Sequence, residues 1–201
     1  MLETGDDALC LKSGINEDGR RVGRPTENVV VRHITTLSCH GGFVIGSDMS
    51  GGVRNVLAQD CVFDGSACGI RLKSNAERGG VVENVTCRNI TMRQIKREAL
   101  LIETNYGAWL AATNATAYPT FRNISFQDIV CDGAATAASV QGTAHRPVEN
   151  LTLERVSIQA RAGMKFDWVR GLRLRQVTST PASGQPLFFQ NCQDVVEEPA
   201  K

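Results

Sequence analysis

The stretch Asn84–Thr91, which reads NVTCRNIT, decides the fold because it is one copy of a repeat. Each copy has a charged residue, an Asn and an aliphatic residue, and then alternates up to a Val or Ile. Five copies have their Asn at Asn28, Asn55, Asn84, Asn123 and Asn150, and a weaker one starts at Gly171. The steps between copies are about 21 to 39 residues, a period that is typical of solenoids.

A second short segment of alternating residues accompanies most copies. These segments are ALCLKS from Ala8, GFVIGS from Gly42, GIRLKS from Gly69, ALLIET from Ala99 and PLFFQN from Pro186. Alternation with period two and enrichment in Val, Ile and Phe are typical of strands. Strands that recur once per repeat stack in parallel, about 4.8 Å apart. The sequence therefore predicts an all-β protein, a right-handed single-stranded parallel β-helix of roughly seven coils.

The composition excludes several classes of protein. The 201 residues are 42% hydrophobic and 21% charged, which is typical of a folded chain rather than a disordered one. A net charge of +1 gives no broad basic surface for nucleic acid, and no apolar run approaches the roughly 20 residues of a membrane span. The seven cysteines form no CxxC pair, so we expect neither a zinc ribbon nor a full set of disulfides, and we expect the cysteines to pack as small apolar residues. We also expect no cofactor.

The repeated Asn is expected to have a structural role. At a turn its side chain can bond the local backbone and tolerate a positive φ, and stacked copies can bond one another. The Asn-x-Ser/Thr sequons that the repeat creates, such as Asn84-Val85-Thr86, are by-products of this pattern.

Aligning the second strands predicts which side chains share a face. One alternating set is uniformly apolar and is expected to face the core. Its members are Leu9, Phe43, Ile70, Leu100, Leu11, Ile45, Leu72 and Ile102. The other set places Arg71 and Lys73 on one outer face, with Lys12 in the column of Lys73 two coils away. Extending the alignment backwards puts Asp6 beside His40, one strand spacing away, and Asp7 beside Gly41.

This outer face combines groups that suit acid/base chemistry on an acidic substrate. Two neighbouring carboxylates, Asp6 and Asp7, are expected to differ in pKa, so that one holds a proton while the other is ionised. His40 would orient Asp6, and Arg71 and Lys73, together with Lys12, would bind an anionic substrate. Each of these features alone has an ordinary explanation as a turn or a solvated face; their convergence favours a site. Tyr106 lies at the edge of the face, where stacking on a sugar and covering the coil are equally good interpretations.

Several motifs of this chain resemble glycoside hydrolase family 28, the polygalacturonases and their relatives, and most closely bacterial exo-acting members. They are TGDDALCLKSG at 4–14, GRPTENV at 23–29, SCHGGFVIGSDMSGGVRNV at 38–56, CGIRLKS at 68–74 and RGGVVENV at 78–85. The resemblance covers essentially the whole chain. It implies a right-handed parallel β-helix that hydrolyses α-1,4-galacturonide bonds of pectin with inversion and without a metal.

The resemblance also implies roles for individual residues. Asp6 would be the general acid, and Asp7 one of the carboxylates that activate water. His40 would support the acid, Arg71 and Lys73 would bind the galacturonate carboxylate, and Tyr106 would contact the substrate. Two departures are conservative: Cys39-His40-Gly41 stands where the family has Gly-His-Gly, and Leu72 replaces the Ile of Arg-Ile-Lys.

A third departure concerns the Asn-Thr-Asp motif of the family, whose Asp also activates water and which this chain does not contain. We therefore expect residues 1–201 to be a single β-helix domain that is the C-terminal portion of a longer catalytic domain. The longer protein is expected to be a monomer, secreted or periplasmic, that acts on an anionic polysaccharide or oligogalacturonide. Whether the chain is active alone, and whether the action is endo or exo, stays open.

Two other functions remain as alternatives. The first is a non-catalytic β-helix that binds galacturonides without turnover. The second is an eliminase similar to pectate lyases on a related solenoid, which would need an acidic Ca²⁺ cluster that the sequence does not place near Lys73.

Overall fold

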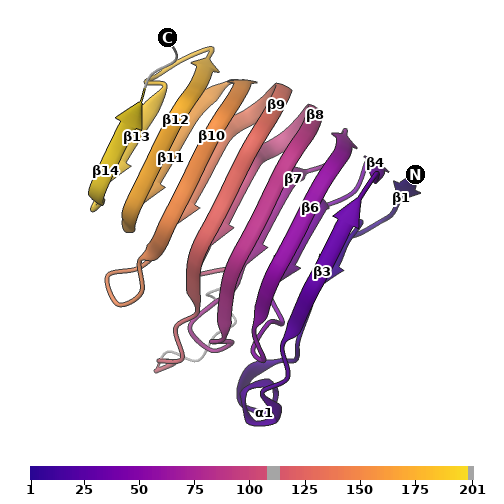
Figure 1. The fold of residues 1–201 in the computed structure, drawn as a ribbon, viewed down its shortest axis with the longest axis vertical. Coiled ribbons are helices and arrows are strands. Elements are labelled where there is room, and N and C mark those ends of the chain that lie inside the picture. The colour runs from indigo at the N-terminus through magenta and orange to yellow at the C-terminus, as the bar shows by residue number, and fades with distance from the viewer. Residues whose placement is uncertain (108–113, 199–201) are drawn as a thin grey trace.

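The computed structural model describes residues 1–107 and 114–198, and these form a right-handed parallel β-helix (Figure 1). Nearly all of the secondary structure is strand. The strands are β1 (Leu2–Glu3), β2 (Cys10–Leu11), β3 (Thr26–Arg32), β4 (Thr35–Leu37), β5 (Gly41–Gly46), β6 (Val53–Asp64), β7 (Cys68–Lys73), β8 (Val81–Glu103), β9 (Thr120–Gln141), β10 (Val148–Ala160), β11 (Ala162–Asp167), β12 (Val169–Pro181), β13 (Leu187–Gln190) and β14 (Gln193–Glu198). The prediction of an all-β solenoid is confirmed.

The strands stack in two parallel series. One series runs β4, β6, β8, β9, β10, β12 and β14, with β3 also paired to β6. The other, which we call the site sheet, consists of β2, β5, β7, the last residues of β8 and β9, β11 and β13. The sequence analysis missed two of its members, the end of β9 and β11. The end of β9 is rich in Ala and Thr and gives little alternation between apolar and polar side chains, whereas β11 does alternate, from Met164 to Asp167, and was overlooked.

Asparagines in the left-handed backbone conformation bend the long strands at one corner of each coil. Asn28, Asn55, Asn84, Asn123 and Asn150 all have φ between 53° and 57°. Their side chains form a ladder, in which each amide nitrogen donates to the Asn oxygen of the preceding coil at 3.0 to 3.2 Å. Asn tolerates this conformation better than most residues with a Cβ, and the ladder pairs its polar groups. The structural interpretation of the repeated Asn is therefore confirmed.

The core is a set of apolar columns that run along the stack. In one column Val56 pairs with Val85, then Ile124 and Leu151 follow on the next strands. In the site sheet Phe43, Ile70 and Leu100 stack in register, as the alignment predicts. The largest fully buried side chains include Phe43, Phe63, Phe121, Phe126 and Phe166. Five cysteines are buried and unbridged, and Cys10 and Cys192 are half-buried, consistent with cysteines that pack as small apolar residues.

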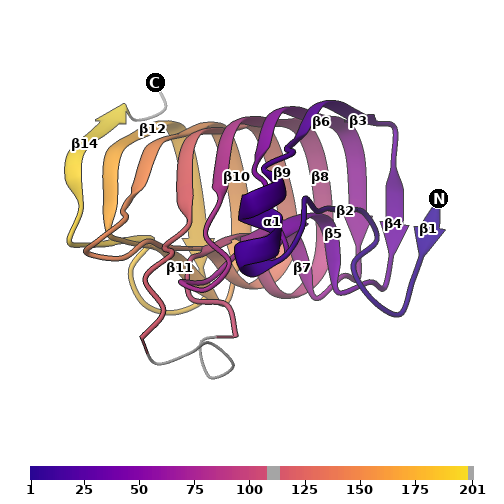
Figure 2. The ribbon, with the colours of Figure 1, turned by 90° about the horizontal axis from the view of Figure 1, so that it is seen from below.

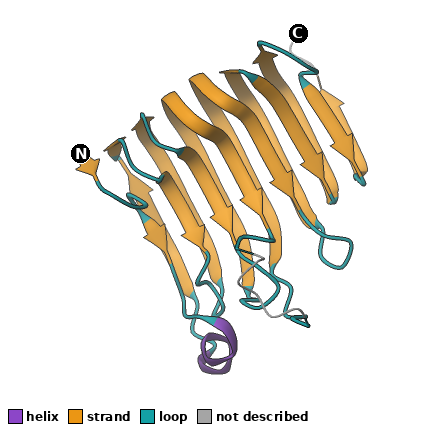
Figure 3. Cartoon of the chain, turned by 180° about the vertical axis from the view of Figure 1, so that it is seen from behind, coloured by secondary structure: helices purple, strands orange, loops and turns teal. Residues whose placement is uncertain are grey.

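One short helix, α1 (Asn16–Val22), lies at one end of the long strands (Figures 1 and 3). Gly23 follows its last residue, and its φ of 61° allows the left-handed cap. Arg20 Nη1 donates to the carbonyl oxygens of Glu77 and Arg78 at 2.7 and 2.9 Å, which fastens the helix to the side of the stack (Figure 2). Among the described residues no helix is both long enough and apolar enough to cross a membrane.

Candidate active site

The outer face of the site sheet brings together residues that are up to 100 positions apart in the sequence. The turn before β2 carries Asp6 and Asp7, and the residue before β5 is His40. The backbone N–H of His40 donates to the carbonyl of Asp6 at 3.1 Å, and the N–H of Cys68 donates to the carbonyl of His40 at 2.9 Å. Asp6 and His40 are therefore neighbours on successive coils, at the register that the alignment predicts.

Asp6 is the exposed member of the acidic pair, with 86% of its side chain accessible. The backbone N–H of Asp7 donates to Asp6 Oδ1 at 2.8 Å, and His40 Nδ1 lies 3.2 Å from the same oxygen. The hydrogen bond from the Asp7 N–H, and then the contact with His40, hold the pKa of Asp6 below its usual value. Asp6 is consequently ionised at neutral pH in this structure.

Asp7 points the other way and forms a buried ion pair. Its Oδ2 lies 2.9 Å from Lys73 Nζ, and each of the two side chains is only 9% accessible. Its Oδ1 is buried and has no hydrogen-bond partner among the described residues. Gly41 leaves room for this carboxylate, because a Cβ there would lie 3.1 Å from Asp7 Oδ1 and 2.3 Å from Val44 Cγ2.

The two cations of the face are more enclosed than the sequence suggests. Arg71 and Lys73 are both buried, at 9% and 7% of their full accessibility. Arg71 donates from Nε and Nη2 to Glu103 Oε1 at 3.0 and 2.7 Å. The ring of Tyr106 covers both cations, with its centroid 4.9 Å from Arg71 Cζ and 5.0 Å from Lys73 Nζ. Tyr106 thus covers the strand. Its ring face lies over both charges, which is the geometry of a cation–π contact.

An open cavity of about 590 Å³ lies over this face, and we call it the site cavity. Residues that line it include His40, Cys68, Arg71, Arg97, Glu103 and Tyr106. Cations and hydrogen-bonding groups therefore face a space that is large enough for a sugar ring. Within the described part of the chain, no three His, Cys, Asp or Glu side chains gather in an arrangement that could hold a metal ion.

Lys12 does not join the other cations, although it lies in the predicted column. Its Nζ lies 3.1 Å from Asp48 Oδ2, and Arg78 Nε lies 3.0 Å from Asp48 Oδ1. The turns after β5 and β7 supply Asp48 and Arg78, and a pattern based on strand period does not place turn residues. Sequence reasoning also gave no role to Glu103, the ion-pair partner of Arg71. Its position in the column of Lys73 was the signal that could have pointed to it.

Comparison with known proteins places this chain in a family. The profile described as Glycosyl hydrolases family 28 matches residues 1–181. A probable polygalacturonase of Vitis vinifera is 34% identical over 194 residues, which cover 92% of this chain and 39% of that protein. A polygalacturonase of Ralstonia solanacearum is 33% identical over 135 residues, covering 64% of this chain and 23% of that protein.

Two solved structures have the same fold. The crystal structure of a hyperthermoactive exopolygalacturonase from Thermotoga maritima aligns with a TM-score of 0.83 and 30% identity, covering 92% of this chain and 41% of its own. A family 28 exopolygalacturonase of Yersinia enterocolitica aligns with a TM-score of 0.82 at 19% identity, covering 100% of this chain and 36% of its own. This chain therefore spans about two-fifths of the length of such relatives. Since the profile matches most of its residues, the chain belongs to glycosyl hydrolases family 28.

Proposed function

We propose that this chain carries catalytic and substrate-binding residues of a polygalacturonase, an enzyme that hydrolyses α-1,4-galacturonide bonds of pectin with inversion. The observation that carries the proposal is the convergence of Asp6, Asp7, His40, Arg71 and Lys73 on one face beside the site cavity. The family membership supports it, as do the names of the relatives.

Arg71 and Lys73 are suited to bind the carboxylate of a galacturonate unit. Both are desolvated, so a hydrogen bond from either to an anion is stronger than on an open surface. The contacts of Arg71 with Glu103 use Nε and Nη2, which leaves Nη1 as a donor for the ligand. The half-buried ring of Tyr106, at the wall of the same cavity, offers an apolar surface for the sugar.

Asp6 is proposed as the general acid, and for this role it must gain a proton when the substrate binds. In the free structure it is ionised, because the Asp7 N–H and His40 favour the charged form. A bound galacturonide would cover Asp6 and bring its own negative charge close to it. Both desolvation and a nearby like charge raise the pKa of a carboxyl group. The proposed mechanism therefore couples protonation of Asp6 to binding of the acidic substrate.

Asp7 is proposed as one of the carboxylates that activate water. Lys73 holds its Oδ2, which leaves the buried Oδ1 as the acceptor for a water proton. A buried acceptor without a partner costs about 1–3 kcal/mol, so this oxygen favours a bound water molecule. In an inverting hydrolase such a water attacks the anomeric carbon while the acid protonates the leaving oxygen.

The test compares binding and hydrolysis in four proteins: the unaltered chain, Asp6→Asn, Asp7→Asn and Lys12→Met. Binding of trigalacturonate is followed by calorimetry, and hydrolysis of polygalacturonate by release of reducing ends. We expect the two aspartate variants to bind but to lose about 10²- to 10⁴-fold in rate, as loss of a general acid or base does. Lys12→Met is expected to retain the rate, because Lys12 is held by Asp48 away from the cavity.

The outcomes separate hydrolysis from simple binding. Proton NMR of the first product should show the inverted anomer. Binding by all four proteins with turnover in none of them, the unaltered chain included, would favour a galacturonide-binding β-helix instead. An unsaturated product would indicate elimination, and an Asp6→Asn chain as fast as the unaltered one would remove Asp6 from the role of acid.

The proposal extends to the setting in which the protein acts. Its partner would be an anionic polysaccharide, either galacturonan or its oligomers, matching the cations in the site cavity. A polysaccharide is too large to enter a cell, so we propose that the protein is exported. We also propose that it acts as a monomer. Size-exclusion chromatography with light scattering and detection of the protein in the culture medium test these two points.

A further inference from the structure

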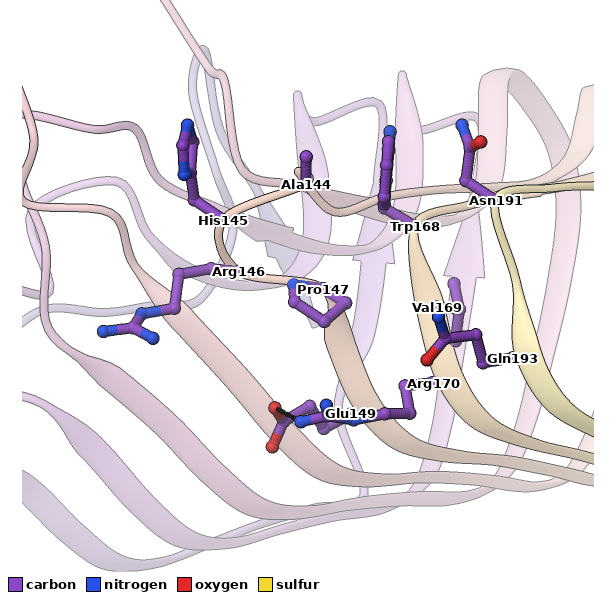
Figure 4. A pocket seen from close by; sticks show the side chains of 10 residues that line it. All are labelled: Ala144, His145, Arg146, Pro147, Glu149, Trp168, Val169, Arg170, Asn191 and Gln193. Carbon is purple, nitrogen blue, oxygen red and sulfur yellow. Dashed lines mark hydrogen bonds and ion pairs between the residues drawn. The ribbon is translucent and has the colours of Figure 1, made fainter.

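A second cavity lies at a corner of the β-helix, away from the residues described above. Its volume is about 280 Å³, and we call it the corner cavity. It lies where the coils pass from β9, β11 and β13 into β10, β12 and β14. Its walls include His145, Pro147, Glu149, Trp168, Arg170 and Asn191 (Figure 4).

Trp168 occupies a backbone position that suits a different residue. Its φ is 54°, in the left-handed region that bulky residues rarely adopt. On the next coil Asn191 has the matching position with a φ of 52°, and Gly52, at the same corner of an upstream coil, has a φ of 94°. Asn and Gly are the residues that adopt this conformation most readily. Because a Trp is unfavourable here for the backbone, its indole calls for another explanation, and such strained residues gather at binding sites.

The side chains of the corner cavity are arranged like those of a sugar site. His145, Trp168 and Asn191 project from successive coils toward the same side (Figure 4). Tyr118 stacks on His145, with ring centroids 4.9 Å apart and planes at 25°, and so fixes the imidazole. Flat rings beside hydrogen-bonding groups suit a pyranose, which has an apolar face and a polar rim.

One cation at this corner can bind an acidic ligand. Glu149 and Arg170 form an ion pair in the wall of the corner cavity. Arg146 is exposed at the rim, and no carboxylate among the described residues pairs with it. Asp167 adds a second carboxylate beside the cavity, where its Oδ1 accepts from Asn191 Nδ2 at 2.9 Å, so the formal charges of the corner balance. The group that can bind an anion is therefore the guanidinium of Arg146.

The corner cavity also lies on the edge of the site sheet that carries Tyr106. Asp167, directly before Trp168, is in the register column of Lys73, which continues through Glu103 and Gln141. Three strand spacings separate Lys73 from Asp167, or about 14 Å along the stack. A single polysaccharide chain is long enough to reach both places.

From these observations we propose that the corner cavity is a second binding site, which takes a galacturonate unit of the polysaccharide between His145 and Trp168. This inference rests on the proposed function for the identity of the ligand. The site would hold the polymer without taking part in the reaction.

Tryptophan fluorescence can test the corner cavity directly. The chain has two Trp residues, and Trp109 lies outside the described residues. In a Trp109→Phe protein Trp168 is the sole indole, and titration with trigalacturonate should change its emission in a saturable manner. The change should persist when Tyr106→Ala is added, because Tyr106 belongs to the site cavity.

A Trp168→Asn variant provides the second measurement. Asn suits the left-handed backbone, so this variant should fold as well as the unaltered chain, which its circular dichroism and urea midpoint check. Calorimetry should still show the binding that depends on Tyr106. Retardation in a gel that contains polygalacturonate should weaken roughly fivefold, the effect of one lost aromatic contact.

The results distinguish failure of this inference from failure of the proposed function. If Trp168 emission stays constant at saturation while calorimetry shows binding that depends on Tyr106, the corner site is overturned and the proposed function stands. If the emission changes but no binding depends on Tyr106, the site cavity loses its proposed role and the corner site stands. Absence of both signals overturns both proposals.

Discussion

Replacing Lys73 by Met should strongly destabilise the protein, because it breaks a buried ion pair. The substitution keeps the length of the apolar stem but removes the ammonium group that lies 2.9 Å from Asp7 Oδ2. Both side chains are 9% accessible, and Asp7 Oδ1 has no other partner among the described residues. Removing one member of a buried ion pair costs about 3–5 kcal/mol, because the remaining charge stays desolvated.

The assay is urea unfolding followed by circular dichroism. A loss of this size should lower the urea midpoint by about 1–2 M, given the usual slopes for proteins of this class. Lys12→Met is the matched control, because Lys12 also pairs with an aspartate but is 53% accessible. Its partner Asp48 keeps Arg78, so we expect a loss of at most about 1 kcal/mol.

A double variant completes the cycle. Lys73→Met combined with Asp7→Asn removes both charges, so it should recover much of the stability lost in Lys73→Met alone. Equal midpoints for Lys73→Met and Lys12→Met would refute the reasoning, since the pair would then behave as a solvated one.

Three further predictions concern the ladder, the acidic pair and the thiols. Asn84→Ala should lower the free energy of unfolding in urea by about 2 kcal/mol, because it loses two ladder bonds of 3.1 Å and places an Ala at a φ of 56°. Asn84→Gly should lower it by about half of that, and equal losses for the two variants would contradict this account. The pKa of Asp6 is lowered by the Asp7 N–H and by His40, so its contribution to stability is present above about pH 3.9 and disappears as the pH falls through the folded-state pKa. His40→Gln should raise this pKa in a carboxyl NMR titration, and an unchanged titration would show that His40 has no such effect. Burial raises the pKa of Cys68 to about 11 and that of Cys131 to about 12, so iodoacetamide at pH 8 should alkylate the half-buried Cys192 first, which mass spectrometry of the peptides checks.

The sequence alone was enough to predict the solenoid and its register. An Asn followed by alternating aliphatic residues recurs once per coil, and stacked coils place equivalent residues about 4.8 Å apart. The Asn ladder, the column of Phe43, Ile70 and Leu100, and the contact between Asp6 and His40 all follow from that period. The strand at the end of β9 could not be found in this way, because its Ala and Thr residues give no clear alternation between apolar and polar side chains.

Only the tertiary structure decided how the charged side chains pair within that register. The repeat period of the sequence predicts which column a residue occupies, but it does not predict the direction of the side chain or the path of the neighbouring turn. The turns place Asp48 against Lys12 and Tyr106 over Arg71, and they vary in length from coil to coil. The enclosure of Lys73 with Asp7 and the aromatic wall of the corner cavity depend on these same contacts between turns and strands. Repetition thus determines the backbone, whereas the irregular turns determine which charges are buried, paired or left facing a cavity.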